Sequence, residues 1–339
     1  MKKAATIKDV AKALGISVST VSRVMNGQDR VSGDMRKRVT ETARKLNYVP
    51  SHAAVSVVKK QTRILAVLLP DLHTPLYARI LDGIEEAARI RGYYPMLVLT
   101  RGRQDEEKNF LGSTMGRFVD AVAAIPSSPE LSHFTAFPKP TVLIENGGDD
   151  DNIDSVSIDN FRGSYLAAEH LLQMGHGKIA IISGDKALST GHDRFWGFEQ
   201  ALRDKGLAVK PPYTCIGGWA EKDGYAAAFR LLHVEDPPTA IFAAGEHLCR
   251  GAIMAAHDLK LRLGRDISLV GFEDSDLARI TSPAVTVVNR AAAEMGTIAA
   301  NILTEHLASS APSTVPQKVS LPPKLIVRNS VRDISGLGL

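Results

Sequence analysis

The chain has 339 residues and a mass of 36.5 kDa. Since a single hydrophobic core rarely extends beyond roughly 250–300 residues, this length predicts at least two domains. With 44% hydrophobic and 23% charged residues, the composition excludes a mainly disordered chain, and no apolar run is long enough to span a bilayer.

The formal net charge of +4 is unevenly distributed along the chain. Residues 1–60 carry 13 basic and 4 acidic side chains, a net +9, whereas residues 61–339 carry 28 basic and 33 acidic ones, a net −5. A basic segment attached to an acidic body predicts a polyanion as the partner of the basic segment.

Three short amphipathic helices are predicted within residues 1–47. Thr6 is expected to cap the first, which ends at Gly15. The second begins at Ser17, and Ser32 is expected to cap the third. The short joint containing Gly15 is typical of a helix-turn-helix, a unit that can lay its second helix in the major groove of DNA.

The exposed face of the second helix carries groups that can read base edges. Arg23 is suited to pair with guanine, Val18 to touch a thymine methyl group, and Ser19 and Ser22 to bond base edges or phosphates. The third helix adds basic residues with phosphate affinity: Arg36, Lys37, Arg38, Arg44 and Lys45. The alternative is a three-helix bundle whose basic surface is only solvated.

The motifs of the first 50 residues stand in a distinctive order. Residues 6–11 read TIKDVA, residues 15–27 read GISVSTVSRVMNG, and Leu46-Asn47-Tyr48 follows. This set closely resembles the head of the lactose/galactose repressor (LacI/GalR) family of bacterial transcriptional regulators. The resemblance implies that Val18, Ser19 and Arg23 read bases. It also implies backbone contacts to DNA from polar residues of the same segment: Thr6, Ser17, Thr20, Ser22, Asn26, Arg30 and Ser32.

Residues 50–62 join this head to the rest of the chain. Ser51 can cap a short helix, but so few residues rarely hold a helix without packing, so a flexible linker is expected in the absence of DNA. In the resembling family the segment folds on DNA and inserts a leucine into the minor groove. The resemblance implies that Ala54 and Val57 take the minor-groove positions here, and the shorter Val57 would kink DNA less.

From Arg63 onward, short apolar runs alternate with helical stretches. Strands are expected at residues 64–69, 95–99, 121–125, 141–144, 178–182, 240–243 and 268–270. Helices are expected at residues 77–91, 161–174, 194–205, 222–232, 247–259 and 291–307. This alternation predicts an α/β fold with parallel, doubly wound sheets, whose ligands bind at the carboxyl ends of the strands.

The resemblance continues through this part of the chain, for example at Ser157-Ile158-Asp159-Asn160 and Val270-Gly271-Phe272. It implies a two-lobed, periplasmic-binding-protein-like effector domain behind the helix-turn-helix head. The expected domains are a DNA-binding domain at 1–49, a hinge at 50–62, and an effector-binding and dimerisation domain at 63–339. Lobe 1 is expected at about 63–158 and 289–321, and lobe 2 at about 159–288 and 322–339.

The resemblance also places an effector site between the lobes. The implied effector-binding residues are Leu76, Tyr77, Thr190, Arg194, Trp219, Glu246, Glu273 and Arg290. Trp219 and Tyr77 can lie against the apolar faces of a ring whose hydroxyls bond the charged groups, so a sugar or sugar acid is expected. A nucleoside, a purine or a phosphorylated metabolite is the alternative. Arg290 stands where Gln is frequent in the family, so two arginines either pair with Glu273 or favour an acidic ligand.

Other classes of protein are less well supported. No GxSxG, HExxH, P-loop or GxGxxG motif occurs in strand-helix context, so neither an enzyme nor a cofactor is expected. Cys215 and Cys249 lack metal-ligand spacing and are expected to be buried thiols. A transport receptor would need a signal peptide, and the polar N-terminus predicts a cytoplasmic location. The expected protein is a homodimer that binds near-palindromic operator DNA and a small-molecule effector, without a membrane or a metal.

Overall fold

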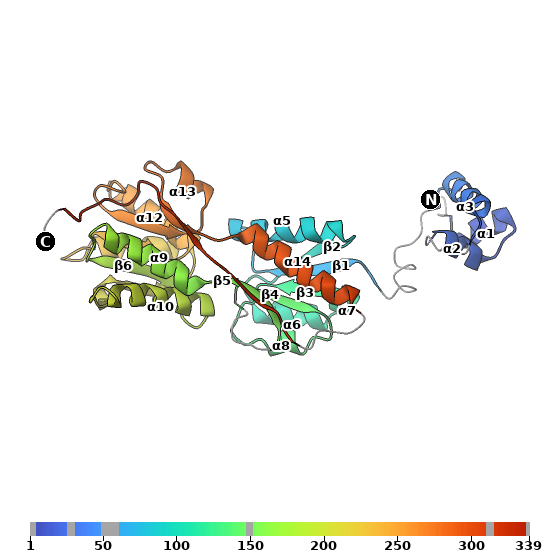
Figure 1. Cartoon of the computed structure of the whole chain (residues 1–339), viewed down its shortest axis with the longest axis horizontal. Coiled ribbons are helices and arrows are strands. Elements are labelled where there is room, and N and C mark those ends of the chain that lie inside the picture. The colour runs from blue at the N-terminus through green and yellow to red at the C-terminus, as the bar shows by residue number, and fades with distance from the viewer. Residues whose placement is uncertain (1–4, 26–30, 49–60, 147–151, 310–314, 337–339) are drawn as a thin grey trace. The chain divides into compact units, whose positions relative to one another are not determined.

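The computed structural model describes residues 5–25, 31–48, 61–146, 152–309 and 315–336 (Figure 1). The chain divides into two compact units, Met1–Thr62 and Arg63–Leu339. In the described part of the chain, no helix is long and apolar enough to cross a membrane.

The first unit contains α1 (Ile7–Leu14), α2 (Val18–Met25) and α3 (Gly33–Lys45). The predicted helix ends are confirmed: the Asp9 carboxylate accepts hydrogen bonds from the N–H and hydroxyl of Thr6, both at 2.8 Å, and Gly15 ends α1 with a φ of 64°. Such a left-handed residue is least costly as glycine. Apolar residues from all three helices form one core: Val10, Ala11, Val21, Val24, Val39 and Ala43.

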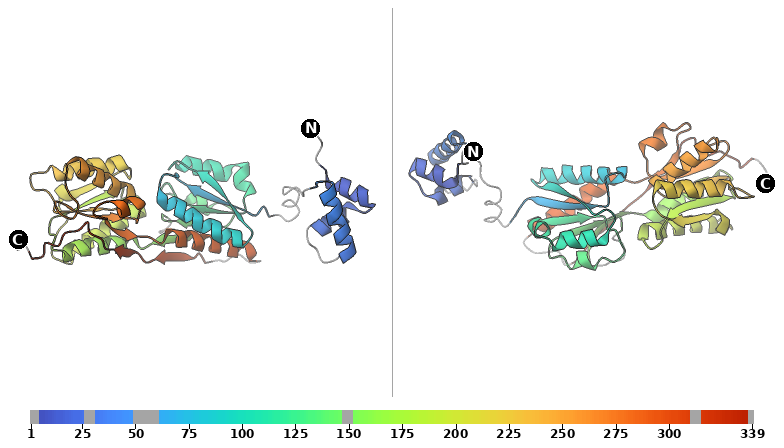
Figure 2. Two further views of the ribbon diagram at one scale, coloured as in Figure 1. Left: turned by 90° about the horizontal axis from the view of Figure 1, so that it is seen from above. Right: turned by 180° about the vertical axis from the view of Figure 1, so that it is seen from behind.

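The second unit contains two six-stranded sheets, each the centre of one lobe (Figure 2). Lobe 1 is built on the order β11-β5-β4-β3-β1-β2, and lobe 2 on the order β12-β10-β9-β8-β6-β7. All neighbouring strands are parallel except β10 and β12, which pair antiparallel. The predicted fold class, α/β with two parallel-sheet lobes behind a helix-turn-helix, is therefore confirmed.

The sheet of lobe 1 is covered by helices on both faces. Its strands are β1 (Ile64–Leu69), β2 (Tyr94–Leu99), β3 (Ala121–Ala124), β4 (Thr141–Ile144), β5 (Asp154–Ile158) and β11 (Lys318–Leu321). Leu65, Val67 and Leu69 of β1 pack towards α5 (Pro75–Ile90) and α14 (Ala292–Ala308). The alternate residues of β1 pack towards α6 (Gln104–Gly112) and α8 (Ser132–Thr135), while α7 (Thr114–Phe118) follows α6.

Lobe 2 repeats this arrangement. Its strands are β6 (Ile179–Gly184), β7 (Thr214–Gly217), β8 (Ala240–Ala243), β9 (Ser268–Phe272), β10 (Thr286–Asn289) and β12 (Lys324–Ile326). Helices α9 (Asn160–Gln173) and α10 (Ser189–Arg203) cover one face, and α11 (Glu221–Leu232) and α12 (Glu246–Asp258) cover the other. The 3-10 helix η1 (Pro211–Tyr213) precedes β7, and α13 (Asp276–Ile280) follows β9.

Three chain segments connect the lobes. The chain leaves lobe 1 between β5 and α9, returns between β10 and α14, and crosses again between β11 and β12. Figure 1 shows these segments running side by side between the two sheets. Each lobe is consequently discontinuous in sequence, and any change in the angle between the lobes must be absorbed by these few residues.

Candidate functional site

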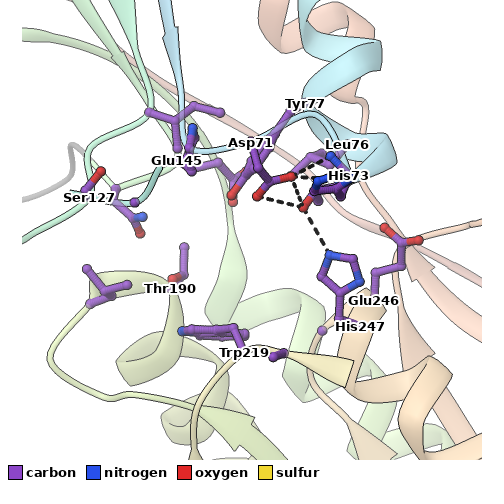
Figure 3. A pocket seen from close by; sticks show the side chains of 18 of the residues that line it. Asp71, His73, Leu76, Tyr77, Ser127, Glu145, Thr190, Trp219, Glu246 and His247 are labelled. Atoms are coloured by element: carbon purple, nitrogen blue, oxygen red, sulfur yellow. Dashed lines mark hydrogen bonds between the residues drawn. The ribbon is translucent and has the colours of Figure 1, made fainter. Parts of the chain in front are cut away.

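A cleft of about 630 Å³ lies between the lobes, at the carboxyl ends of their parallel strands (Figure 3). Lobe 1 contributes Asp71 after β1, Ser127 after β3 and Glu145 after β4. Lobe 2 contributes Trp219 after β7 and Glu246 after β8. The location follows from topology, because loops at the carboxyl ends of parallel strands meet at one edge of a sheet.

The structure brings together most of the residues that the sequence assigned to the effector site. Seven of them line this cleft: Leu76, Tyr77, Thr190, Arg194, Trp219, Glu246 and Arg290. Helix α10 begins at Ser189 rather than at Arg194 as expected, so Thr190 and Arg194 lie one turn apart on one helix face.

Glu273 is the exception, because it does not line this cleft. Its side chain is fully buried and its carboxylate accepts a hydrogen bond of 2.7 Å from Nε of Arg290 and one of 3.4 Å from Nη1 of Arg79. Its φ of 91° lies in the left-handed region, which is strained for a non-glycine residue. Glu273 therefore bonds Arg290 of the cleft wall without lining this cleft itself, and its expected contact with an effector stays a prediction.

Trp219 forms part of the cleft floor because two glycines let its ring approach the strand ends. A Cβ atom on Gly184 would lie 1.9 Å from the indole, and one on Gly245 would lie 3.2 Å from it. Gly245 belongs to the Ala244-Gly245-Glu246 segment that follows β8. A larger residue at position 245 would press against the ring.

Arg194 is buried among aromatic and polar partners. Its guanidinium carbon lies 3.9 Å from the Phe272 ring centroid and 5.5 Å from that of Trp219. Nε donates to Oδ1 of Asn160 and Nη1 donates to the Ala244 carbonyl, both at 2.8 Å. Burial, followed by the like charge of Arg290, lowers the pKa of Arg194 to about 9, so the side chain remains charged at neutral pH.

Tyr77 presents a neutral hydroxyl group to the cleft. Burial raises the pKa of Tyr77 to about 12, and the nearby carboxylates of Asp71 and Glu145 act in the same direction. The phenol is therefore protonated throughout the physiological range and can act as both donor and acceptor.

A hydrogen bond between the lobes lies at one end of the cleft. Nδ1 of His247 is 2.6 Å from Nη2 of Arg250, and because a guanidinium only donates, Nδ1 must be the acceptor. The proton then sits on Nε2, which donates to the Thr74 hydroxyl at 3.1 Å across the lobes (Figure 3). Burial, followed by the charge of Arg250, lowers the pKa of His247 and favours this neutral form.

Several cleft residues were missed from the sequence. Asp71, Ser127 and Glu145 each follow a strand that the sequence did predict, so the rule that ligands bind at carboxyl ends of strands identifies them in retrospect. Further polar residues of the cleft were also missed: His73, Thr74, Asn146, Glu221, His247 and Arg250.

The second helix of the head presents the predicted base-reading residues to solvent. Val18, Ser19 and Arg23 are exposed on α2, whereas Val21 and Val24 of the same helix are buried. Among the predicted backbone-contact residues, Thr6, Ser17 and Ser32 are exposed, and Thr20 and Ser22 are half-buried. The other predicted DNA-contact residues lie outside the described part of the chain: Asn26, Arg30, Ala54 and Val57.

Hydroxyl groups at the start of α2 are bonded to one another. The Ser17 hydroxyl lies 2.8 Å from those of Ser19 and Thr20, and it also accepts a hydrogen bond of 3.1 Å from the Thr20 N–H. This arrangement caps α2 and restricts the rotamers of the side chains that precede Arg23.

A helix-turn-helix head joined to a two-lobed body with a polar cleft defines the class of DNA-binding regulators that carry a small-molecule site. The model of the bacterial regulatory proteins of the lacI family matches residues 6–51, and that of the periplasmic binding protein-like domain matches residues 168–331. The HTH-type transcriptional repressor PurR of Haemophilus influenzae (strain PittEE) is 32% identical over 334 residues, covering 97% of this chain and 99% of that protein. The chain belongs to the lacI family of bacterial regulatory proteins and is an HTH-type transcriptional repressor rather than an enzyme.

Solved structures of related proteins share the fold. The complex of the transcriptional regulator CelR with cellobiose has a TM-score of 0.73 at 28% identity, covering 96% of this chain and 99% of that chain. The lac repressor bound to ONPG in the repressed state has a TM-score of 0.84 at 25% identity, covering 97% of this chain and 100% of that chain. Operator DNA and a small-molecule effector are the partners that this family implies.

Proposed function

We propose that the chain is a homodimeric repressor that reads a near-palindromic operator with residues 1–49 and senses an effector with residues 63–339, through a hinge at residues 50–62. The observation that carries this proposal is the cleft of about 630 Å³, whose lining comes from both lobes. A ligand that contacts both lobes shifts the equilibrium between lobe arrangements by the difference in its affinities for them. Operator and effector affinities are then coupled reciprocally.

On the DNA side, Val18, Ser19 and Arg23 read base edges. Their exposure on α2 opposite the buried Val21 and Val24 supports this role, since that face is free to enter a major groove. The backbone contacts come from Thr6, Ser17, Thr20, Ser22, Asn26, Arg30 and Ser32, and the minor-groove contacts of the hinge come from Ala54 and Val57.

The effector is a sugar or a sugar acid. The flat indole of Trp219 supports the apolar face of a ring, while the hydroxyl of Tyr77 and that of Thr190 lie at the cleft wall to bond its hydroxyls. A structural neighbour that carries cellobiose supports the same class of ligand.

A purine is the second candidate, because the relatives named PurR are 30–32% identical over nearly the whole chain. A purine base would also stack on Trp219, so the aromatic floor alone does not separate the two ligands. Hydrogen bonding distinguishes the two ligand classes, since a sugar offers donors around its whole ring whereas a purine offers them only at its edge.

The fluorescence of Trp219 should respond to the effector. The chain has two tryptophans, and Trp196 is exposed on α10, so Trp196→Phe leaves Trp219 as the only reporter. In this background we expect one member of a panel of sugars, sugar acids, purine bases and nucleosides to give a saturable change in emission. The same compound should change operator affinity in a gel shift, with a coupling of roughly 5- to 150-fold.

Arg194→Ala in the same background should abolish the emission change, because Arg194 lines the cleft next to Trp219. Arg203→Ala is the matched control, since Arg203 lies on the same helix but at the surface, where it pairs with Glu199. An effector response that persists in Arg194→Ala would place the ligand outside the cleft.

Dimerisation is proposed to use the edge of the lobe 1 sheet. The edge strand β2 leaves large apolar side chains exposed: Tyr94 by 67%, Leu97 by 37% and Leu99 by 44%. The end of the neighbouring helix α5 adds Ile90, which is 74% exposed. An exposed apolar edge strand is a site of association with another chain, so these residues support a second copy as the partner.

Leu97→Asp should therefore convert the dimer into a monomer and weaken operator binding, because a charge would be buried in the interface. Leu207→Asp is the matched control, since Leu207 is also 37% exposed but lies in lobe 2 after α10. Molar mass from light scattering checks both variants. A Leu97→Asp protein that keeps the mass of a dimer would exclude β2 as the interface.

A further inference from the structure

Two buried guanidinium groups face the cleft, and carboxylates neutralise them. Arg290 donates from Nη1 to Oε2 of Glu145 and from Nε to Oε2 of Glu273, both at 2.7 Å. The side chain of Arg290 is only 6% exposed, and those of Glu145 and Glu273 are 5% and 0% exposed. Since Glu145 belongs to lobe 1 and Glu273 to lobe 2, Arg290 joins the two lobes from the crossover segment that links β10 to α14.

The ion pairs extend in both directions from Arg290. Nη1 of Arg79 lies 3.4 Å from Glu273, and Nη2 of Arg194 lies 3.8 Å from Glu145. The resulting row Arg79–Glu273–Arg290–Glu145–Arg194, named here the ion-pair ladder, alternates in sign and passes from one lobe to the other.

The backbone supports the ladder at both carboxylates. Glu145 has a φ of 72° and Glu273 a φ of 91°, directly after β4 and β9. Left-handed conformations cost free energy in residues other than glycine and persist only where surrounding contacts hold them. Although burial alone would lower it, the pKa of Arg290 is raised by the charges of Glu145 and Glu273.

The formal charge of the cleft lining is negative, although burial raises the pKa of Glu246, one of its carboxylates. The lining contains the four carboxylates of Asp71, Glu145, Glu221 and Glu246, against the three guanidinium groups of Arg194, Arg250 and Arg290. Arg250 also has a carboxylate partner, because its Nε lies 2.6 Å from Glu221. An anionic ligand would therefore meet arginines that are already paired and carboxylates that repel it.

Most of the polar atoms that lack a partner are acceptors. Among the described residues of the cleft, Oε1 of Glu145, Oδ1 of Asn146 and Oε2 of Glu246 are buried without a hydrogen-bond partner. Two donors are on the same footing, Nε1 of Trp219 and Nε of Arg250, although the latter lies 2.6 Å from Glu221. Buried acceptors of this kind require hydroxyl or N–H donors from whatever occupies the cleft.

We infer that Glu145 determines the ligand specificity of the cleft. By pairing with Arg290 and Arg194, its carboxylate excludes anions. Its unpartnered Oε1 selects an uncharged ligand that donates hydrogen bonds, such as a sugar or polyol. This inference rests on the proposed function only in taking the cleft as the effector site. It decides between the sugar and the sugar acid, and it counts against a phosphorylated metabolite. The two arginines that suggested an acidic ligand from sequence already have carboxylate partners in the ion-pair ladder.

Inorganic phosphate is the probe that tests the inference, because its binding requires neither the effector nor DNA. Full-length protein carrying Trp196→Phe is titrated with phosphate at constant ionic strength, with chloride as the reference salt and Trp219 emission as the readout. The protein with Glu145 intact should show no saturable change. Glu145→Gln, which preserves shape but removes the charge, should show saturable binding at phosphate concentrations at least about tenfold below the highest one that leaves the parent unchanged, as expected for removal of one adjacent charge.

Two further variants complete the design. Glu145→Asp keeps the charge and should again show no saturable phosphate binding, while Glu130→Gln removes a surface carboxylate outside the cleft and should behave like the parent. Saturable phosphate binding with Glu145 intact overturns the inference, and this measurement does not depend on the folding of any Glu145 variant. A folded Glu145→Gln protein that gains no phosphate affinity overturns it equally.

Failure of the inference about Glu145 can be distinguished from failure of the proposed function. If no compound changes operator affinity, the proposed regulation fails whatever the phosphate titration gives. If instead a sugar acid or sugar phosphate changes operator affinity and Arg194→Ala abolishes the response, the regulation stands and the inference about Glu145 is wrong.

Discussion

Arg23→Ala is expected to remove most of the discrimination between the operator and unrelated DNA, the largest functional effect of any single substitution proposed here. A bidentate contact from arginine to guanine contributes about 1–3 kcal/mol of discrimination, or roughly 5- to 150-fold. In a dimer the loss occurs in both half-sites, so its free energy doubles. Arg23 is exposed on α2, and truncating it leaves the buried Val21 and Val24 in place.

A competition gel shift at fixed salt, with operator and unrelated competitor DNA, measures this effect. Lys37→Ala is the matched control, because Lys37 is exposed on α3 and is expected to contact only phosphate. It should weaken binding to both DNAs alike and reduce the slope of log affinity against log salt by about 1 per subunit. Unchanged discrimination in Arg23→Ala would show that α2 is not the recognition helix.

Arg290→Met is expected to cause the largest loss of stability. The substitution preserves much of the side-chain volume but leaves Glu145 and Glu273 buried without their main counter-ion. Removing one partner of a buried ion pair typically destabilises a protein by about 3–5 kcal/mol, because the remaining charge is left desolvated. The two left-handed backbone positions would also lose the contact that holds them.

Urea unfolding followed by circular dichroism measures this loss. Arg89→Met is the matched control, because Arg89 pairs with Glu85 on α5 with both side chains largely exposed, at 61% and 47%. Exposed pairs of this kind contribute little, so the control should unfold at the same urea concentration as the parent. If Arg290→Met also unfolds there, the ion-pair ladder does not stabilise the arrangement of the lobes.

The elements that the sequence predicts well are those with strong local patterns. The head follows from caps and 3.6-residue periodicity, and its predicted caps Thr6 and Ser32 flank α1 and α3 as observed. The strands predicted at 64–69, 141–144 and 240–243 have the observed bounds, because continuous apolar runs mark strands that are buried on both faces.

Three of the strands that the sequence missed depend on contacts between distant segments. Strands β11 and β12 are short and half-exposed, and they exist because β11 pairs with β5 and β12 pairs with β10. Strand β7 is an edge strand with exposed residues, so it lacks the apolar run that identifies its neighbour β6. The local propensity of a segment does not predict its pairing with a distant strand.

The same division holds for the cleft. The resemblance to the family implies that Tyr77, Arg194 and Trp219 form a set suited to a ring-shaped ligand, and the structure places all three in one cleft. The sequence did not predict which carboxylate lines the cleft. Glu273 was expected there but only bonds Arg290 of the wall, whereas Glu145 was not predicted and lines the cleft.

Charge, caps and periodicity are local properties of the chain, so they are enough to predict a basic helix-turn-helix segment followed by an acidic α/β body. The role of the arginines in the cleft depends instead on how distant segments meet. Arg290 and Glu145 are 145 residues apart in sequence and 2.7 Å apart in space. Electrostatic interactions depend on distance and burial rather than on position along the chain, so whether a guanidinium is free to bind an anion or is already neutralised is settled only when the two lobes are folded together.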